Sequence, residues 1–251
     1  MAEDIILATE GLVKEFRGFV AVNGVDLAIA RHAIHALIGP NGAGKTTCFN
    51  LLTKFLTPTR GRILFKGRDI TPLKPAAVAR LGLVRSFQIS AVFPHLTALE
   101  NVRIALQRRR GNSYDFWRSE RVLAVFDDEA ARLLADVGLE GFAAVPAAEL
   151  PYGRKRALEI ATTLALDPEV MLLDEPTAGM THDDVERIVA LIRRIRKGRT
   201  IVMVEHNLSV VEGLCDRITV LTRGRVIAEG DYATVSRHPE VRAAYLGAED
   251  A

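Results

Sequence analysis

The sequence has little cysteine, no long apolar run and almost no excess charge. Only two of the 251 residues are cysteines, Cys48 and Cys215, and their wide separation argues against a disulfide framework or a cysteine zinc site. Lysine and arginine number 33 against 31 aspartate and glutamate, a formal net charge of +2, which argues against a nucleic-acid binder held by bulk electrostatics. No segment approaches the roughly 18–20 apolar residues of a membrane span, and the acidic start is unlike a signal peptide. These absences predict a soluble intracellular protein with at most a peripheral role at a membrane.

Short β-branched apolar runs alternate with helical patterns along the chain, which indicates an α/β fold with a mainly parallel sheet. The expected strands are Ala33–Ile38, Val170–Leu173, Thr200–Val204 and Ile218–Thr222, with a hairpin continuing into Val226–Ala228. Apolar residues at helical spacing predict helices over Lys45–Leu56 and Asp183–Lys197.

Two additions to this sheet are expected. The segments Ile5–Thr9, Val25–Ile29 and Arg62–Phe65 indicate a small antiparallel sheet near the N-terminus. Between Phe93 and Leu164 strand signals vanish, so a helical subdomain is expected there, with Arg108–Ser113 as an exposed loop. The predicted division is a single unit of 251 residues: a sheet core over 1–92 and 165–231, a helical part over 93–164 and a C-terminal tail over 232–251.

One glycine-rich segment fits the phosphate-loop pattern G-x-x-x-x-G-K-[ST] in full. It is Gly39-Pro40-Asn41-Gly42-Ala43-Gly44-Lys45-Thr46-Thr47. It follows an expected strand and precedes an expected helix, as the mechanism requires. Its glycines let backbone N–H groups point at phosphate oxygens, Lys45 can reach the outer phosphates, and the Thr46 hydroxyl can bind Mg²⁺. A chance match of the fixed positions in a chain of this length is expected roughly one time in a hundred, so the segment predicts nucleotide binding.

Polar residues follow two other expected strands. Asp174 and Glu175 end an apolar strand, where Asp174 is suited to hold Mg²⁺ and Glu175 to orient or deprotonate a water molecule. His206 follows Thr200–Val204, and the parallel sheet would bring it to the same end as Asp174. Alone, an Asp-Glu pair often marks only a polar loop and a lone histidine is often structural. Gln88 has no strong functional signal of its own.

Together these motifs resemble the ATP-binding subunit of an ABC transporter over nearly the whole chain. The phosphate loop, Gln88, the strand Val170–Glu175, Pro176–Met180 and His206 follow the family's order and approximate spacing. The resemblance implies a P-loop (RecA-like) ATPase core with an antiparallel β subdomain and an inserted helical subdomain. It also implies that ATP and Mg²⁺ bind, with Thr46, Gln88 and Asp174 at the metal and Glu175 and His206 in catalysis. Phe16 aligns with an aromatic residue that stacks on adenine, although its residue type alone suggests a core position.

The family's signature Leu-Ser-Gly-Gly-Gln aligns with Leu150-Pro151-Tyr152-Gly153-Arg154, which is a departure from the pattern. The family's serine contacts the γ-phosphate bound on the partner subunit, whereas Pro151 has neither a hydroxyl nor an N–H. Proline suits the first turn of a helix, so the fold should tolerate it. By resemblance Pro151, Tyr152, Gly153 and Arg154 are candidates for contact with the partner's nucleotide, and Arg154 either compensates in charge or is solvated.

Other segments resemble ATPases of bacterial importers for branched-chain amino acids, a group that includes urea and short-amide importers. They are Tyr152–Ala161, Ala178–Met180, Val226–Gly230 and Ala244–Gly247. The implied partners are a second ATPase subunit, identical or paralogous, transmembrane permease subunits and, indirectly, a periplasmic or lipid-anchored solute-binding protein. The implied location is the cytoplasmic face of the membrane, with no nucleic-acid partner. The competing functions are an ABC ATPase acting on nucleic acid or ribosomes and a regulatory module that binds ATP without hydrolysis.

Overall fold

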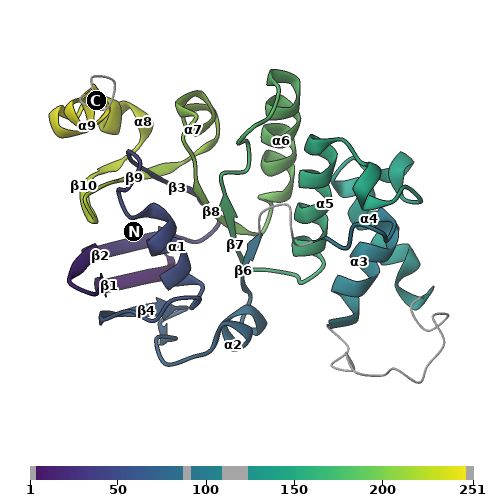
Figure 1. Ribbon diagram of the computed structural model, residues 1–251, viewed down its shortest axis with the longest axis horizontal. Helices are drawn as coiled ribbons and strands as arrows, with labels where there is room; N and C mark the ends of the chain where they lie inside the picture. Colours follow the sequence, from purple (N-terminus) through teal and green to yellow (C-terminus); the bar gives the residue numbers. More distant parts are fainter. Residues whose placement is uncertain (1–3, 87–91, 109–123, 247–251) are drawn as a thin grey trace. The chain divides into compact units, whose positions relative to one another are not determined.

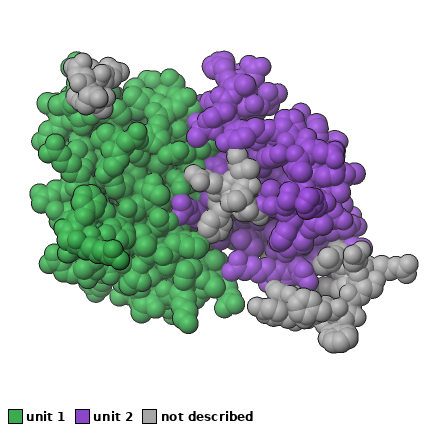
Figure 2. Space-filling model, in the orientation of Figure 1, with its two compact units in different colours: residues 1–83, 169–176, 196–251 green, residues 84–168, 177–195 purple. Residues whose placement is uncertain are grey.

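The computed structural model describes residues 4–86, 92–108 and 124–246 (Figure 1). The chain forms two compact units, which are coloured separately in Figure 2. The first unit comprises residues 1–83, 169–176 and 196–251, and the second comprises residues 84–168 and 177–195. None of the helices in the described ranges is long and apolar enough to cross a membrane.

The smaller sheet of the first unit is antiparallel, with the strand order β2-β1-β4-β5. Its strands are β1 (Ile5–Phe16), β2 (Phe19–Ala30), β4 (Arg60–Phe65) and β5 (Arg68–Asp69). β1 and β2 extend further than the alternation of apolar and polar residues predicts, because β-bulges occur where that alternation breaks. At one bulge Gly11 has a φ of 55°, and its N–H donates to the Asp26 carboxylate. The antiparallel addition expected from the sequence is therefore confirmed.

The larger sheet is mainly parallel, with the order β10-β9-β3-β8-β7-β6. Its strands are β3 (Ile34–Ile38), β6 (Leu83–Ser86), β7 (Val170–Asp174), β8 (Thr200–Val204), β9 (Arg217–Thr222) and β10 (Arg225–Gly230). Every residue of β3, β7 and β8 is buried, as expected for parallel strands covered on both faces. Leu37 pairs with Val204, and Val204 pairs with Asp174. The segments that follow these three strands therefore leave the sheet at the same level.

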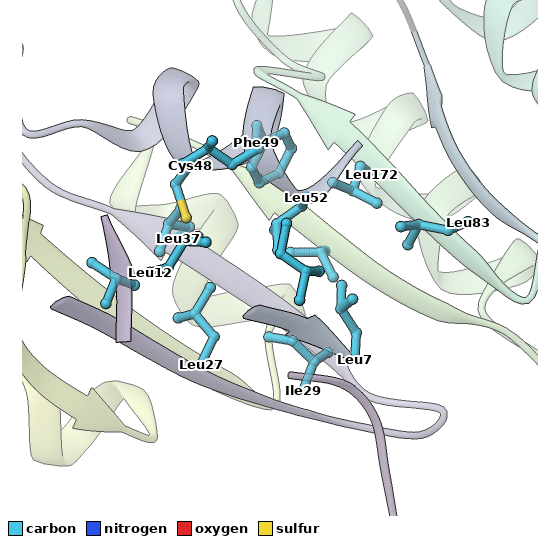
Figure 3. Close-up of a cluster of buried hydrophobic side chains, with 14 of the residues drawn as sticks. Leu7, Leu12, Leu27, Ile29, Leu37, Cys48, Phe49, Leu52, Leu83 and Leu172 are labelled. Atoms are coloured by element: carbon cyan, nitrogen blue, oxygen red, sulfur yellow. The ribbon is translucent and has the colours of Figure 1, made fainter. Parts of the chain in front are cut away.

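The core of the first unit forms around α1 (Lys45–Leu52), from which Cys48, Phe49 and Leu52 point inward (Figure 3). These side chains pack with buried residues from both sheets, including Leu7, Leu12, Leu27, Ile29, Leu37 and Leu172. Each large apolar side chain buried in this way contributes roughly 1.5–3 kcal/mol. Burial also raises the pKa of Cys48 to about 12, so its thiol stays protonated and acts as a small apolar group. The other helices of this unit are α2 (Pro75–Arg80), α7 (Leu208–Leu214), α8 (Tyr232–Arg237) and α9 (Pro239–Leu246).

Helix α1 ends at Leu52, although the apolar pattern predicts a helix as far as Leu56. Lys54 has a φ of 64°, a left-handed conformation that stops a right-handed helix. The hydroxyl of Thr53 donates to the Phe49 carbonyl at 2.8 Å and satisfies one of the last carbonyls. Glycine normally marks such a stop, so a lysine there gives no sequence signal of the helix end.

The second unit consists mainly of helices. They are α3 (Ala98–Gln107), α4 (Asp127–Asp136), α5 (Tyr152–Leu164) and α6 (His182–Ile195), with short 3₁₀ turns at Glu140–Phe142 and Ala147–Glu149. A capping box starts α3, since Thr97 accepts the Glu100 N–H and the Glu100 carboxylate accepts the Thr97 N–H. Helices follow Phe93, and the unit also includes α6, which lies in the stretch 165–231 that the sequence assigns to the sheet core. Of the predicted loop Arg108–Ser113, only Arg108 lies within the described residues.

A polar chain runs through the first unit's larger sheet from the buried His35 on β3. His35 Nε2 lies 2.7 Å from the Thr219 hydroxyl. That hydroxyl donates to Glu229 at 3.1 Å, and Arg217 donates to the same carboxylate at 2.8 Å. Burial, with a smaller contribution from the Arg217 charge, lowers the pKa of His35 to about 4. The folded protein therefore holds His35 neutral at pH values where the unfolded chain protonates it.

We expect His35 to make stability fall as the pH drops from 6.5 to 4. In that window the unfolded state binds the proton and the folded state does not, so protonation favours unfolding by about 3 kcal/mol in total. Urea unfolding of His35→Gln at pH 7, 5.5 and 4.5 should show a smaller acid loss than the native chain, by about 2 kcal/mol at pH 4.5. His95→Gln, at an exposed position, is the matched control. A His35→Gln profile parallel to the native one would contradict the assignment.

Candidate active site

The phosphate loop joins β3 to α1 and is closely packed on the protein side. Gly39, Gly42 and Gly44 have positive φ values of 148°, 77° and 98°. A Cβ on Gly39 would lie 2.1 Å from the Leu221 carbonyl oxygen, and one on Gly44 would lie 2.4 Å from a backbone oxygen of β2. The first and last glycines of the motif are thus required by both space and conformation. The curled backbone ends at Gly44, the N-cap of α1.

Lys45, the first residue of α1, is only 5% exposed. Its ammonium group donates to the carbonyls of Gly39 at 2.6 Å and Pro40 at 3.0 Å, so it folds back over the loop. Burial lowers the pKa of Lys45, whereas the charges of Glu175 and Asp174 raise it. The cation therefore lies between the loop and two carboxylates, where it can bind phosphate oxygens.

Asp174 and Glu175 follow one another at the end of β7, as the sequence predicts, but their backbones differ. Asp174 is the last residue of the strand and is buried. Glu175 has a φ of 45°, and its N–H donates to the Val204 carbonyl at 2.9 Å. A left-handed conformation is uncommon for a residue with a Cβ and is concentrated at functional sites. It ends the strand alternation, under which neighbouring side chains point to opposite faces.

His206 meets Glu175 directly. Its Nε2 lies 2.9 Å from Glu175 Oε1, and both side chains remain partly exposed. The buried Glu205, which the sequence reading did not single out, accepts the backbone N–H groups of His206 at 3.0 Å and Asn207 at 3.2 Å. Asn207 in turn caps α7. A carboxylate thus fixes the backbone that carries the histidine. The sequence signal that could have identified Glu205 was its position directly after an apolar strand.

Phe16 is the last residue of β1, and the positive φ values of Arg17 and Gly18 form the turn that follows it. The ring is 41% exposed, and Lys14 Nζ lies 5.0 Å from its centroid. The core position suggested by its residue type alone is therefore wrong. An exposed ring at a hairpin tip can stack on a planar base.

The signature residues lie in the second unit, at the start of α5. Pro151 is the N-cap, and the Tyr152 hydroxyl donates to the Ala178 carbonyl at 3.1 Å. A Cβ on Gly153 would lie 2.6 Å from an oxygen of Asp184, so the glycine is needed for packing. The Arg154 guanidinium lies 3.8 Å from the centroid of the Phe142 ring. Gln88, the remaining metal candidate, lies outside the described residues.

A pocket of about 750 Å³ opens beside these residues, within the second unit. Three arginines and one carboxylate line it, together with apolar side chains. The charged residues are Arg154, Arg187, Arg194 and Asp184. Asp184 and Arg187 pair at 3.1 Å, so the remaining charge of the lining is positive.

Within the described ranges, no cluster of three or more histidine, cysteine, aspartate or glutamate side chains is arranged to hold a metal. Mg²⁺ does not need such a cage, because it is usually bound by one or two carboxylates together with phosphates and water. Two oxygen donors near Lys45 fit this mode. Thr46 is exposed and follows Lys45 in sequence, and Asp174 is buried and its charge acts on Lys45.

Comparison with known proteins identifies the family. The family model described as ABC transporter matches residues 22–178. The chain belongs to the ABC transporter family of ATP-binding proteins. A second model, described as branched-chain amino acid ATP-binding cassette transporter, matches residues 225–251 of this ABC ATPase.

Relatives match the ABC ATPase over nearly its whole length. The branched-chain amino acid transport ATP-binding protein BraF of Pseudomonas aeruginosa is 38% identical, covering 96% of this chain and 98% of the relative. LivG of Escherichia coli, with the same description, is 37% identical with the same coverage. Among solved structures, the ABC transporter cassette MJ1267 in its ADP conformation has a TM-score of 0.86 at 32% identity, covering 97% of this chain and 99% of that one. These similarities confirm the P-loop ABC ATPase fold and the ATP hydrolysis expected from the resemblance.

Proposed function

We propose that this ABC ATPase energises an importer for branched-chain amino acids. The observation that carries the solute assignment is the identity of 37–38% across nearly the full chain to BraF and LivG, which are described as branched-chain amino acid transport proteins. The match of residues 225–251 to the branched-chain amino acid cassette model supports it independently. The alternative is an importer of urea or short amides, which would use the same cassette with other membrane and solute-binding subunits.

In the proposed mechanism, ATP places its outer phosphates against the backbone N–H groups of the loop Gly39–Thr47 and the N-terminus of α1. Lys45 exchanges its two carbonyl partners for phosphate oxygens. Glu175 accepts a proton from the attacking water as the water oxygen bonds to the γ-phosphorus and the bond to the ADP oxygen breaks. His206 orients the Glu175 carboxylate and contacts the γ-phosphate. Phe16 stacks on the adenine.

Thr46 and Asp174, with Gln88, would hold Mg²⁺, which when bound neutralises charge on the phosphates. A complex with a second ATPase subunit, identical or paralogous, completes the proposal. A related cassette, MJ0796, is described as dimeric in a post-hydrolysis state with ADP and phosphate, at 26% identity and a TM-score of 0.76. In this chain the residues Pro151–Arg154 start a helix beside an arginine-lined pocket, where an N-terminus favours negative charge. This surface is suited to face the nucleotide held by the other subunit.

The membrane permease subunits are proposed to dock on the helical unit, with the ATPase on the cytoplasmic face of the membrane. Phe93 is 52% exposed although it is large and apolar. The buried Asn101 holds its backbone on both sides, because the amide oxygen accepts the Phe93 N–H at 2.7 Å and the amide nitrogen donates to the Phe93 carbonyl at 3.1 Å. A rigidly presented aromatic ring of this kind is typical of an interface anchor.

The transport proposal is tested by reconstituting the ATPase in liposomes with the permease subunits that co-purify from membranes. ATP hydrolysis is then measured with a solute-binding protein loaded with leucine. Stimulation by the leucine-loaded protein is expected. Stimulation only by a urea- or amide-loaded protein would overturn the solute, and no stimulation by any loaded protein would overturn the importer function.

Phe93→Ser should remove most of this stimulation while leaving the basal ATPase rate of the isolated chain unchanged. The reason is that Phe93 lies in the helical unit and has no part in the phosphate chemistry. Phe55→Ser, at a similarly exposed position in the other unit, is the matched control. Full stimulation in the Phe93 variant would show that permeases dock elsewhere.

A further inference from the structure

The second unit contains a cavity that phosphate binding and catalysis do not use. It is the pocket of about 750 Å³ beside the start of α5, and this volume is typical of a small-molecule site. Helix α5 packs against both α4 and α6, as Figure 1 shows. The pocket is lined by α5, by α6 and by the turn after α4. Four of the lining residues have small side chains or none, which leaves space between these elements: Gly138, Gly153, Ala157 and Ala190.

The wall of the pocket is mainly apolar. Its apolar residues are Val137, Leu139, Pro151, Ala157, Ile188, Ala190 and Leu191. The larger aliphatic side chains among them are buried, so packing within the unit fixes the wall. An aliphatic group that enters the pocket would displace water from this wall. Each methylene buried in this way tightens binding by up to about fourfold.

Two guanidinium groups at the pocket are not neutralised by a carboxylate. Arg154 stacks on the Phe142 ring, 3.8 Å from its centroid, and donates to the Gly138 carbonyl at 3.4 Å. Arg194 donates to the Asp136 carbonyl. The two acceptor carbonyls are two residues apart, so the two guanidinium groups lie close together. Neither pairs with a carboxylate among the described residues, and most of their five N–H donors remain available.

The third arginine of the pocket is already paired. Asp184, the one carboxylate of the lining, accepts from Arg187 at 3.1 Å and from the Thr181 hydroxyl at 3.0 Å. The charges of Arg154 and Arg194 therefore stand unpaired over an apolar wall. This combination fits a molecule with one anionic headgroup and an aliphatic body. A bare anion would leave the wall hydrated, and a cation would be repelled.

We propose that this pocket is a binding site for an aliphatic carboxylate, whose headgroup binds the Arg154 and Arg194 guanidinium groups and whose chain lies on the apolar wall. Pro151 and Arg154 line the pocket and also belong to the segment proposed above to face the other subunit's nucleotide. A bound carboxylate would neutralise a positive charge beside that segment and so lower the ATPase rate. This regulatory consequence rests on the proposed function, whereas binding itself does not.

The test is isothermal titration of the full nucleotide-free chain with octanoate. Octanoate should bind at one site per chain. Acetate, which lacks the aliphatic body, and octylammonium, which reverses the charge, should bind far more weakly. Arg194→Gln should weaken octanoate binding about ten- to hundredfold, because hydrogen bonds to a charged group are lost. Arg132→Gln, at an exposed position on α4 outside the pocket lining, is the matched control and should bind octanoate as the native chain does.

A second variant, Ala190→Phe, fills the pocket without changing its charge. Ala190 is exposed, so the variant should melt close to the native chain while losing octanoate binding. Equal binding of octanoate and octylammonium, or undiminished octanoate binding in both variants, would overturn the proposal.

The regulatory consequence has its own measurement. Octanoate should lower the ATPase rate of the native chain and should have little effect on the rate of Arg194→Gln. Binding without an effect on the native rate would overturn the regulatory consequence, and it would leave the importer function to its own test in liposomes.

Discussion

Glu175→Gln is expected to lower the ATPase turnover about 10²- to 10³-fold while leaving ATP binding intact. Glutamine has the same shape and keeps an oxygen that can face His206 Nε2, now 2.9 Å from Glu175 Oε1. Its amide cannot accept the proton of the attacking water, and a general base typically contributes 10²- to 10⁴-fold. Since ATP binds and is not cleaved, the proposed ATP-bound dimer should accumulate. Single-turnover hydrolysis, nucleotide affinity and gel filtration with ATP measure these effects.

Glu169→Gln provides the matched control for this prediction. Glu169 directly precedes β7, at the opposite end from Glu175, and it pairs with Lys66 on the protein surface. The same change of charge is made there without touching the phosphate site, so turnover should stay within about twofold. Near-normal turnover of Glu175→Gln would remove this residue from the mechanism. Loss of ATP binding instead would assign it a role in holding the nucleotide.

The parallel sheet and the phosphate loop could be predicted from the sequence because local pattern and tertiary environment agree. The runs at β3, β7 and β8 are continuously apolar, and each strand is buried along its whole length. The loop's glycines occupy left-handed positions, as their residue type indicates. Parallel strands end together, so the sequence could place His206 at the same end of the sheet as Asp174, the residue before Glu175.

Other features of the structure could not be predicted from local sequence patterns. Glu175 and Lys54 have a left-handed backbone, which their residue types rarely adopt. The sequence therefore predicted neither the direction of the Glu175 carboxylate nor the end of α1. The exposure of Phe16 is set by its place at a hairpin tip, which its apolar character does not reveal.

Gly39→Ala should be among the most damaging substitutions in the phosphate loop, with a loss of about 2–6 kcal/mol in the free energy of unfolding. The backbone φ of 148° is strained for alanine, which costs roughly 1–3 kcal/mol. The new Cβ would also lie 2.1 Å from the Leu221 carbonyl oxygen, and such overpacking typically costs another 1–3 kcal/mol. The carbonyl cannot easily move away, because Leu221 is paired with Val226 in the β9–β10 hairpin.

Gly42→Ala isolates the packing effect from the conformational one. Gly42 also has a positive φ, of 77°, but nothing lies within 4 Å of a Cβ placed there. Its cost should be limited to the left-handed conformation, about 1–2 kcal/mol. Urea unfolding of the nucleotide-free chain compares the two variants without interference from ATP. Equal losses would show that the loop can shift away from β9. A larger loss for Gly39→Ala would show that β9 packs rigidly against the start of the phosphate loop.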